Sequence, residues 1–111
     1  MGLVNSTIRV KLLMSQKFDY EQKQLSITQA LTTLAGAITE LEAVGNDYTD
    51  PNNPVLKTIN ERVKKLNYLE KRLQGQLKQY ELRIKEIDAE LQSAVQMRDK
   101  WIETSFKYGG R

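Results

Sequence analysis

The 111-residue sequence contains no cysteine and no histidine. Without cysteine, the chain can form neither a disulfide nor a thiolate metal site. Without histidine, it lacks the side chain that most often serves as a general base and as a nitrogen ligand to metals. The sequence also has no phosphate-binding glycine loop, nucleophile elbow or metal-ligand spacing. We therefore expect a protein that is not an enzyme and that binds no cofactor, metal or small-molecule substrate.

The sequence also has no long hydrophobic run. We therefore expect no cleavable signal peptide and no membrane-spanning helix. Aromatic residues make up only 7% of the chain, while apolar residues make up 40%. This composition is enough for a seam between helices but not for a thick core. We expect one domain that is cytoplasmic or exported by a route that needs no signal peptide.

Apolar residues recur in alternating steps of three and four along two blocks of the chain. This heptad pattern is typical of helices that pack side by side. Glu70 and Arg98 interrupt it, and either fix the register of an assembly or extend their charged ends to water. The repeat positions are Val10, Leu13, Lys17, Tyr20, Gln24, Ile27, Leu31, Leu34, Ile38 and Leu41, then Ile59, Val63, Leu66, Glu70, Leu73, Leu77, Tyr80, Ile84, Ile87, Leu91, Ala94, Arg98 and Trp101.

The two blocks are separated by a polar segment that contains both prolines of the chain. We predict a helix over about 6–44, a loop over 45–53, a helix over about 54–106 and a frayed tail over 107–111. The predicted fold class is all-α: an extended antiparallel two-helix hairpin, or coiled coil, that forms a single domain over residues 1–111.

The loop residues suggest how each helix ends or begins. Gly45 is expected to end the first helix because glycine adopts the left-handed C-terminal conformation at little steric cost. Asn53 is expected to cap the second helix, with Pro54 at its first helical position. The predicted loop and turn residues are Gly45, Asp50, Pro51, Asn53 and Pro54.

Further apolar residues flank the seam, although a two-helix contact needs them only at the heptad a and d positions. Apolar flanks indicate that each helix has more than one neighbour, so we expect a homo-oligomer or a partner helix. On the predicted register, the end of the second helix reaches or passes the start of the first. The predicted protein-interface residues are Ala30, Ala35, Ala37, Val95, Met97, Trp101, Ile102 and Phe106.

Several features allow two interpretations. The apolar stretch from Leu3 to Leu13 is either a membrane-surface or partner-binding segment, or it packs against Trp101 and Phe106 at the end of the second helix, and the sequence favours packing. Gly36 and Gly75 are either tolerated at the surface or approached closely by a neighbouring subunit. Gly2 fits an N-myristoylation pattern, but the sequence favours a helix entry at which Ser6 is the cap. The net charge of +3 arises from interspersed acids and bases, which argues against a nucleic-acid partner.

The turn Asp50-Pro51-Asn52-Asn53-Pro54, leading into Val55-Leu56, resembles the turn of bacterial type III secretion needle and filament subunits. The resemblance implies a helical hairpin whose C-terminal helix packs into a helical tube. This chain is longer than typical needle subunits, lacks their tryptophan-containing N-terminal segment and continues through Lys107 to Arg111. The resemblance therefore extends only to the turn at Asp50–Pro54.

These observations favour a structural subunit that assembles with itself through helix–helix packing, in a filament or needle of the secretion type. The alternative is a coiled-coil adaptor or chaperone dimer that binds a client helix.

Overall fold

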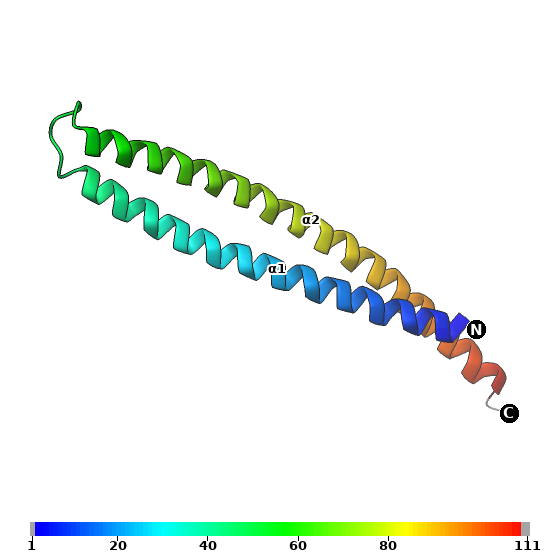
Figure 1. The fold of residues 1–111 in the computed structure, drawn as a ribbon. Helices are drawn as coiled ribbons and strands as arrows, with labels where there is room; N and C mark the ends of the chain where they lie inside the picture. Colours follow the sequence, from blue (N-terminus) through cyan, green and yellow to red (C-terminus); the bar gives the residue numbers. More distant parts are fainter. Residues whose placement is uncertain (1, 110–111) are drawn as a thin grey trace. The chain divides into compact units, whose positions relative to one another are not determined.

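The computed structural model of the chain describes residues 2–109. Helix α1 spans Gly2–Gly45 and helix α2 spans Pro54–Gly109. The two long helices pack against each other in an antiparallel hairpin, with the start of α1 beside the final turns of α2 (Figure 1). The predicted all-α hairpin is therefore confirmed.

The described residues form two compact units. One unit contains residues 2–23 of α1 and 80–109 of α2, and the other contains residues 24–79 with the connecting loop. Each unit pairs a segment of α1 with a segment of α2. That the whole chain forms one domain remains a prediction.

Both helices are longer than the sequence pattern indicates. Helix α1 begins at Gly2 rather than near residue 6. The Thr7 hydroxyl donates a hydrogen bond to the Leu3 carbonyl oxygen at 2.8 Å, as it does in a continuous helix, and Ser6 is buried rather than capping the helix. Helix α2 continues through Gly109 instead of fraying from residue 107. Residues 110–111 of the predicted tail lie outside the described residues.

The heptad seam lies between the helices as predicted. Its α1 positions, from Val10 to Leu41, are all buried or half-buried. Its α2 positions are also buried or half-buried from Ile59 to Arg98, and only Trp101 at the end is more exposed, at 42%. Because one stripe of each helix faces the partner helix, the other faces of both helices remain open to water.

The core of the first unit forms around Ile87, whose side chain is completely buried. Val10, Leu13 and Ala94 complete this buried cluster. Tyr20, Leu91 and Val95 pack against it. In the second unit the buried apolar side chains are Leu34, Ile38 and Ile59.

Polar groups also cross the seam of the first unit. Lys17 Nζ lies 2.8 Å from Asp88 Oδ1. The hydrogen bond to Asp88 and the attraction of its charge raise the pKa of Lys17 above its ordinary value of 10.5. The rings of Tyr20 and Tyr80 lie 5.7 Å apart between centroids, and Lys23 Nζ lies 5.1 Å from the Tyr20 centroid. These pairs add orientation-dependent contacts to the apolar packing.

Gly45 ends α1, but not through a left-handed conformation. Within residues 2–109, no residue has a positive φ angle. Gly45 is instead buried where the helices approach closely, since a Cβ atom placed on it would lie 3.4 Å from Ile59 Cγ2 and 3.6 Å from Leu56 Cδ1. The backbone conformation therefore does not require glycine at this position, and a Cβ atom would meet its neighbours at ordinary contact distance.

The loop is held by local hydrogen bonds. Asp50 Oδ1 accepts a hydrogen bond from the Asn52 backbone N–H at 2.9 Å. Asn53 Oδ1 accepts one from the Val55 N–H at 2.9 Å and thereby caps α2, which begins at Pro54. Side-chain acceptors of this kind satisfy amide groups that have no partner within the helix.

Candidate interaction surfaces

The predicted interface residues fall into both units. Ala30, Ala35 and Ala37 belong to residues 24–79, and the other five belong to the C-terminal part of α2. Ala30 and Ala35 are exposed, whereas Ala37 is half-buried beside the seam. The structure thus places these residues on two separate surfaces.

The C-terminal part of α2 carries large apolar side chains that α1 leaves wholly or partly exposed. Met97, Trp101, Ile102 and Phe106 are all exposed, and Phe106 is 81% exposed. Val95 differs because it packs against the core of its own chain. Met97 and Trp101 line a hollow of about 270 Å³ together with Lys100 and Thr104. Met97 and Trp101 are four residues apart on one side of α2, and Ile102 and Phe106 are four residues apart on another. The two pairs form candidate helix-binding surfaces.

The Trp101 ring lies directly against the first turn of α1. A Cβ atom placed on Gly2 would overlap the indole ring, so the absence of a side chain at residue 2 is what permits this contact. The predicted packing of the N-terminal segment onto the end of α2 therefore occurs at Trp101. Phe106, the other expected partner, remains exposed.

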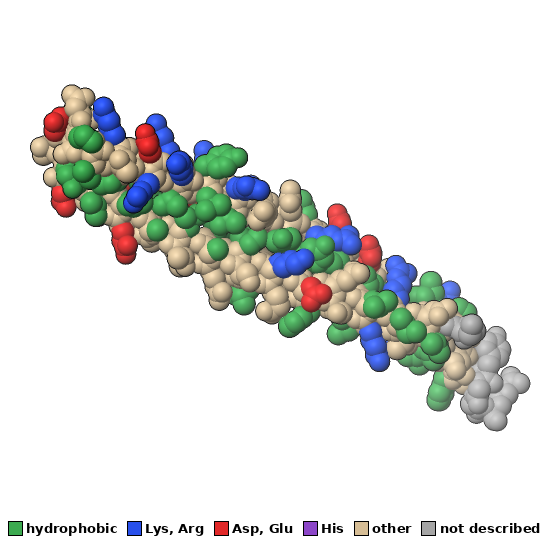
Figure 2. Space-filling view, in the orientation of Figure 1, with side chains coloured by type: hydrophobic (Ala, Val, Ile, Leu, Met, Phe, Trp, Pro, Cys, Tyr) green, Lys and Arg blue, Asp and Glu red, His purple; other side chains and the backbone are tan. Residues whose placement is uncertain are grey.

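The N-terminal part of α1 exposes a second apolar surface. Val10 and Leu13 are buried in the seam, but more than half of each side chain is exposed at Val4, Ile8, Leu12, Met14 and Phe18. The heptad pattern alone did not identify this surface, because it selects only the positions that face the partner helix. The four-residue spacing of Val4, Ile8 and Leu12 was the available signal. Figure 2 shows hydrophobic side chains at the surface among lysine and arginine residues.

Residues 24–39 of α1 form a surface of a different kind. The segment contains no charged residue. The hydroxyl groups of Thr28, Thr32 and Thr39 donate hydrogen bonds to carbonyl oxygens four residues earlier, at 2.9, 3.1 and 2.9 Å. Their polar groups are thereby satisfied within the helix. Gly36 is exposed, and no atom lies within 4 Å of the position of a Cβ atom on it.

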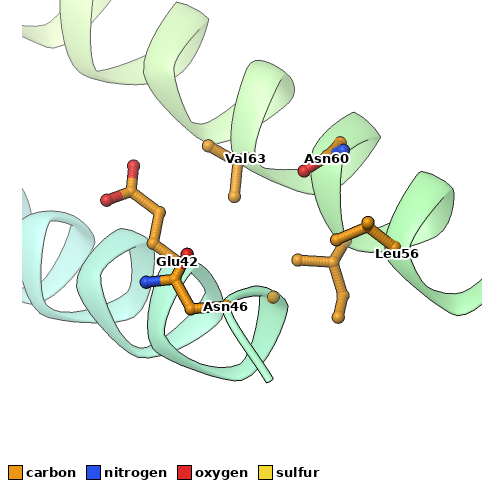
Figure 3. A pocket seen from close by; sticks show the side chains of 7 residues that line it. Glu42, Asn46, Leu56, Asn60 and Val63 are labelled. Atoms are coloured by element: carbon orange, nitrogen blue, oxygen red, sulfur yellow. The ribbon is translucent and has the colours of Figure 1, made fainter. Parts of the chain in front are cut away.

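A hollow of about 220 Å³ lies between the helices at the loop end of the second unit. In Figure 3, side chains from the end of α1 and from the first turns of α2 surround it. The hollow has an apolar part and a rim of one carboxylate and two amides. Its lining residues are Glu42, Gly45, Asn46, Leu56, Ile59, Asn60 and Val63.

Charge is distributed unevenly along the chain. From residue 24 to residue 56 there is no lysine or arginine, while Glu40, Glu42, Asp47 and Asp50 supply four carboxylates. Residues 2–18 show the reverse pattern, with three cationic side chains and no carboxylate. These two segments belong to different units and carry opposite charge.

Two charged residues, Arg98 and Glu70, interrupt the heptad pattern of α2. Arg98 Nε lies 3.6 Å from Asp99 Oδ1, and this buried Nε has no hydrogen-bond partner among the described residues. Glu70 is half-buried. Whether either residue sets the register of an assembly remains a prediction.

No helix in the described part of the chain is long and apolar enough to span a membrane. Residues 2–109 also contain no group of three or more carboxylates placed to hold a metal ion. Comparisons with protein-family models, with curated proteins and with solved structures found no match to this chain. The surfaces themselves are therefore the basis for assigning a function.

Proposed function

We propose that the protein is a structural subunit that assembles with copies of itself through helix–helix packing. One observation carries the proposal: large apolar side chains are exposed in groups, at Val4, Ile8 and Leu12 on α1 and from Met97 to Phe106 on α2. Single exposed apolar residues are ordinary, but contiguous groups mark interaction surfaces. Burying one such side chain contributes about 1.5–3 kcal/mol before ordering costs.

We further propose that the assembly is a filament or needle of the secretion type. One support is the Asp50–Pro54 turn, which resembles that of type III secretion needle and filament subunits. The other is the antiparallel hairpin of two helices that this turn connects. The role proposed here is mechanical rather than catalytic.

The test is the molar mass by light scattering over a hundredfold range of protein concentration. Mass that climbs without a plateau supports open assembly into a filament. A fixed dimer or tetramer at every concentration contradicts the filament and favours the adaptor alternative. A monomer throughout contradicts self-assembly altogether.

A double substitution, Ile102→Ala with Phe106→Ala, locates the contact. Both side chains are exposed, so helicity measured by circular dichroism should be unchanged, whereas assembly should need a higher protein concentration. Trp101 is left intact because it also packs against Gly2. Tyr68→Ala is the matched control, since Tyr68 is 71% exposed but lies outside both apolar groups. Unaltered assembly of the double variant would exclude this end of α2 as a contact.

A further inference from the structure

We propose that copies of the chain join head to tail, with the loop end of one copy docked against the N-terminal part of α1 in the next. The docking surfaces are the acidic end, residues 40–56, and the basic segment, residues 2–18. This inference rests on the proposed self-assembly and names its contact. The occupant of each surface is thus a second copy of this chain.

The acidic end combines negative charge with exposed apolar groups. Residues 24–56 contain these four carboxylates and no lysine or arginine. Glu42 and Asp47 form no ion pair with any described residue. About half of the side chain is exposed at Val44 and at Val55, on either side of the loop. The hollow behind Gly45 adds a recess that an apolar side chain can enter.

The basic segment has the complementary chemistry. Arg9, Lys11 and Lys17 occur in residues 2–18 without a single carboxylate. Lys17 is paired with Asp88, but Arg9 and Lys11 are exposed and form no ion pair within residues 2–109. They lie among the exposed side chains of Val4, Ile8 and Leu12. The basic segment thus offers cations beside exposed apolar side chains. The acidic end offers carboxylates beside exposed apolar side chains, so the two surfaces are complementary.

Charge decides which surfaces can meet. Two acidic ends repel each other, as do two basic segments, whereas an acidic end and a basic segment attract. The remainder of α2 in the first unit, residues 80–109, carries interspersed charges of both signs and offers no comparable single-signed segment. Because the two docking surfaces differ, each bound copy leaves one surface of each kind free, and addition can continue.

Residues 57–79 of α2 are a competing site for the acidic end, since they carry seven lysine or arginine residues against two carboxylates. Large exposed apolar side chains in this stretch occur at Tyr68 and Leu69. Residues 2–18 carry five such side chains. Apolar burial therefore favours the basic segment of α1 as the docking site.

Two charge-reversed variants test the contact. The first is Glu42→Lys with Asp47→Lys, which leaves the Asp50 hydrogen bond in the turn intact. The second is Arg9→Glu with Lys11→Glu. The first variant removes the net negative charge of the acidic end, and each variant alone places like charges at residues 42 and 47 and at residues 9 and 11. Its assembly should therefore need at least about ten times the wild-type concentration. In an equimolar mixture, each junction between the two variants has opposite charges at these positions, so the mixture should assemble with alternating copies at nearly the wild-type concentration.

The matched control is Glu81→Lys with Glu90→Lys, which changes the net charge as much as the first variant does. Both glutamates are exposed on α2 outside the docking surfaces, and the control should assemble like the wild type. Raising the salt concentration should weaken wild-type assembly, because the Debye length falls from about 8 Å at 0.15 M to about 3 Å at 1 M.

The outcomes separate this inference from the function on which it rests. If the wild type remains monomeric at every concentration, the proposed self-assembly is wrong. If the wild type assembles but either reversed variant assembles equally well, the head-to-tail contact is wrong and self-assembly stands. Failure of the mixture to assemble also overturns the contact, provided that circular dichroism shows both variants to be folded.

Discussion

Replacing Ile87 with alanine tests the core of the first unit directly. Ile87 is fully buried among Val10, Leu13 and Ala94. Ile→Ala removes three carbon atoms from the core, each worth about 0.8 kcal/mol of transfer free energy. An unfilled cavity adds to this cost, while the higher helix propensity of alanine returns a few tenths of a kcal/mol. We expect the free energy of unfolding to fall by about 2.5–4 kcal/mol.

The assay is urea unfolding followed by circular dichroism, at a protein concentration where the chain is monomeric. Leu82→Ala is the control, because Leu82 lies on the same helix but is 60% exposed. It should change stability by no more than about 0.5 kcal/mol. Hydrogen exchange should show that Ile87→Ala lowers the protection of residues 2–23 and 80–107 more than that of residues 24–79. Equal losses of stability from the two substitutions would refute the assignment of Ile87 to the seam.

Three further predictions concern Gly2, Gly36 and the Lys17–Asp88 pair. Gly2→Ala should displace the Trp101 ring into water and shift its fluorescence to longer wavelength, and an unchanged spectrum would contradict the contact. Gly36→Ala should stabilise the monomer by about 0.5–1 kcal/mol in urea unfolding, since a Cβ there meets no atom within 4 Å; weaker assembly of the same variant would place a neighbouring subunit over Gly36. Because the pKa of Lys17 is raised by Asp88, the stabilisation from this pair is fully present below Lys17's ordinary value of 10.5 and is lost as pH rises through the raised pKa. Asp88→Asn should remove that part of the pH dependence, measured as the difference in urea midpoint from wild type between neutral pH and about pH 11.

The seam could be predicted from the sequence because a period alternating between three and four residues has one physical meaning in a helix. It marks the stripe that faces a partner helix, and the positions from Val10 to Leu41 and from Ile59 to Arg98 are buried or half-buried accordingly. The start of α2 could also be predicted from the sequence, because Asn53 supplies a side-chain acceptor and Pro54 is suited to the first helical turn.

Other features depend on contacts that a local pattern does not contain. Helix α1 begins at Gly2, which lies against the ring of Trp101. Trp101 is near the opposite end of the sequence, so a local pattern around Gly2 does not contain this contact. The burial of Gly45 depends in the same way on Leu56 and Ile59 across the loop. Glycine at the end of a helix suggests a left-handed residue by frequency alone, whereas Gly45 has no positive φ angle and is buried against the first turns of α2.

The exposed face of α1 links the fold to the proposed assembly. Val10 and Leu13 face α2, yet Val4, Ile8 and Leu12 lie on other sides of the same turns and remain in water. A helix that is apolar around most of its circumference is usually surrounded by protein, and the hairpin supplies α1 with one neighbour. Replacing Val4, Ile8 and Leu12 with serine should therefore leave the core around Ile87 intact while keeping the chain monomeric at concentrations where the wild type assembles. If this triple variant assembled like the wild type, the exposed face of α1 would have to be explained without a second copy.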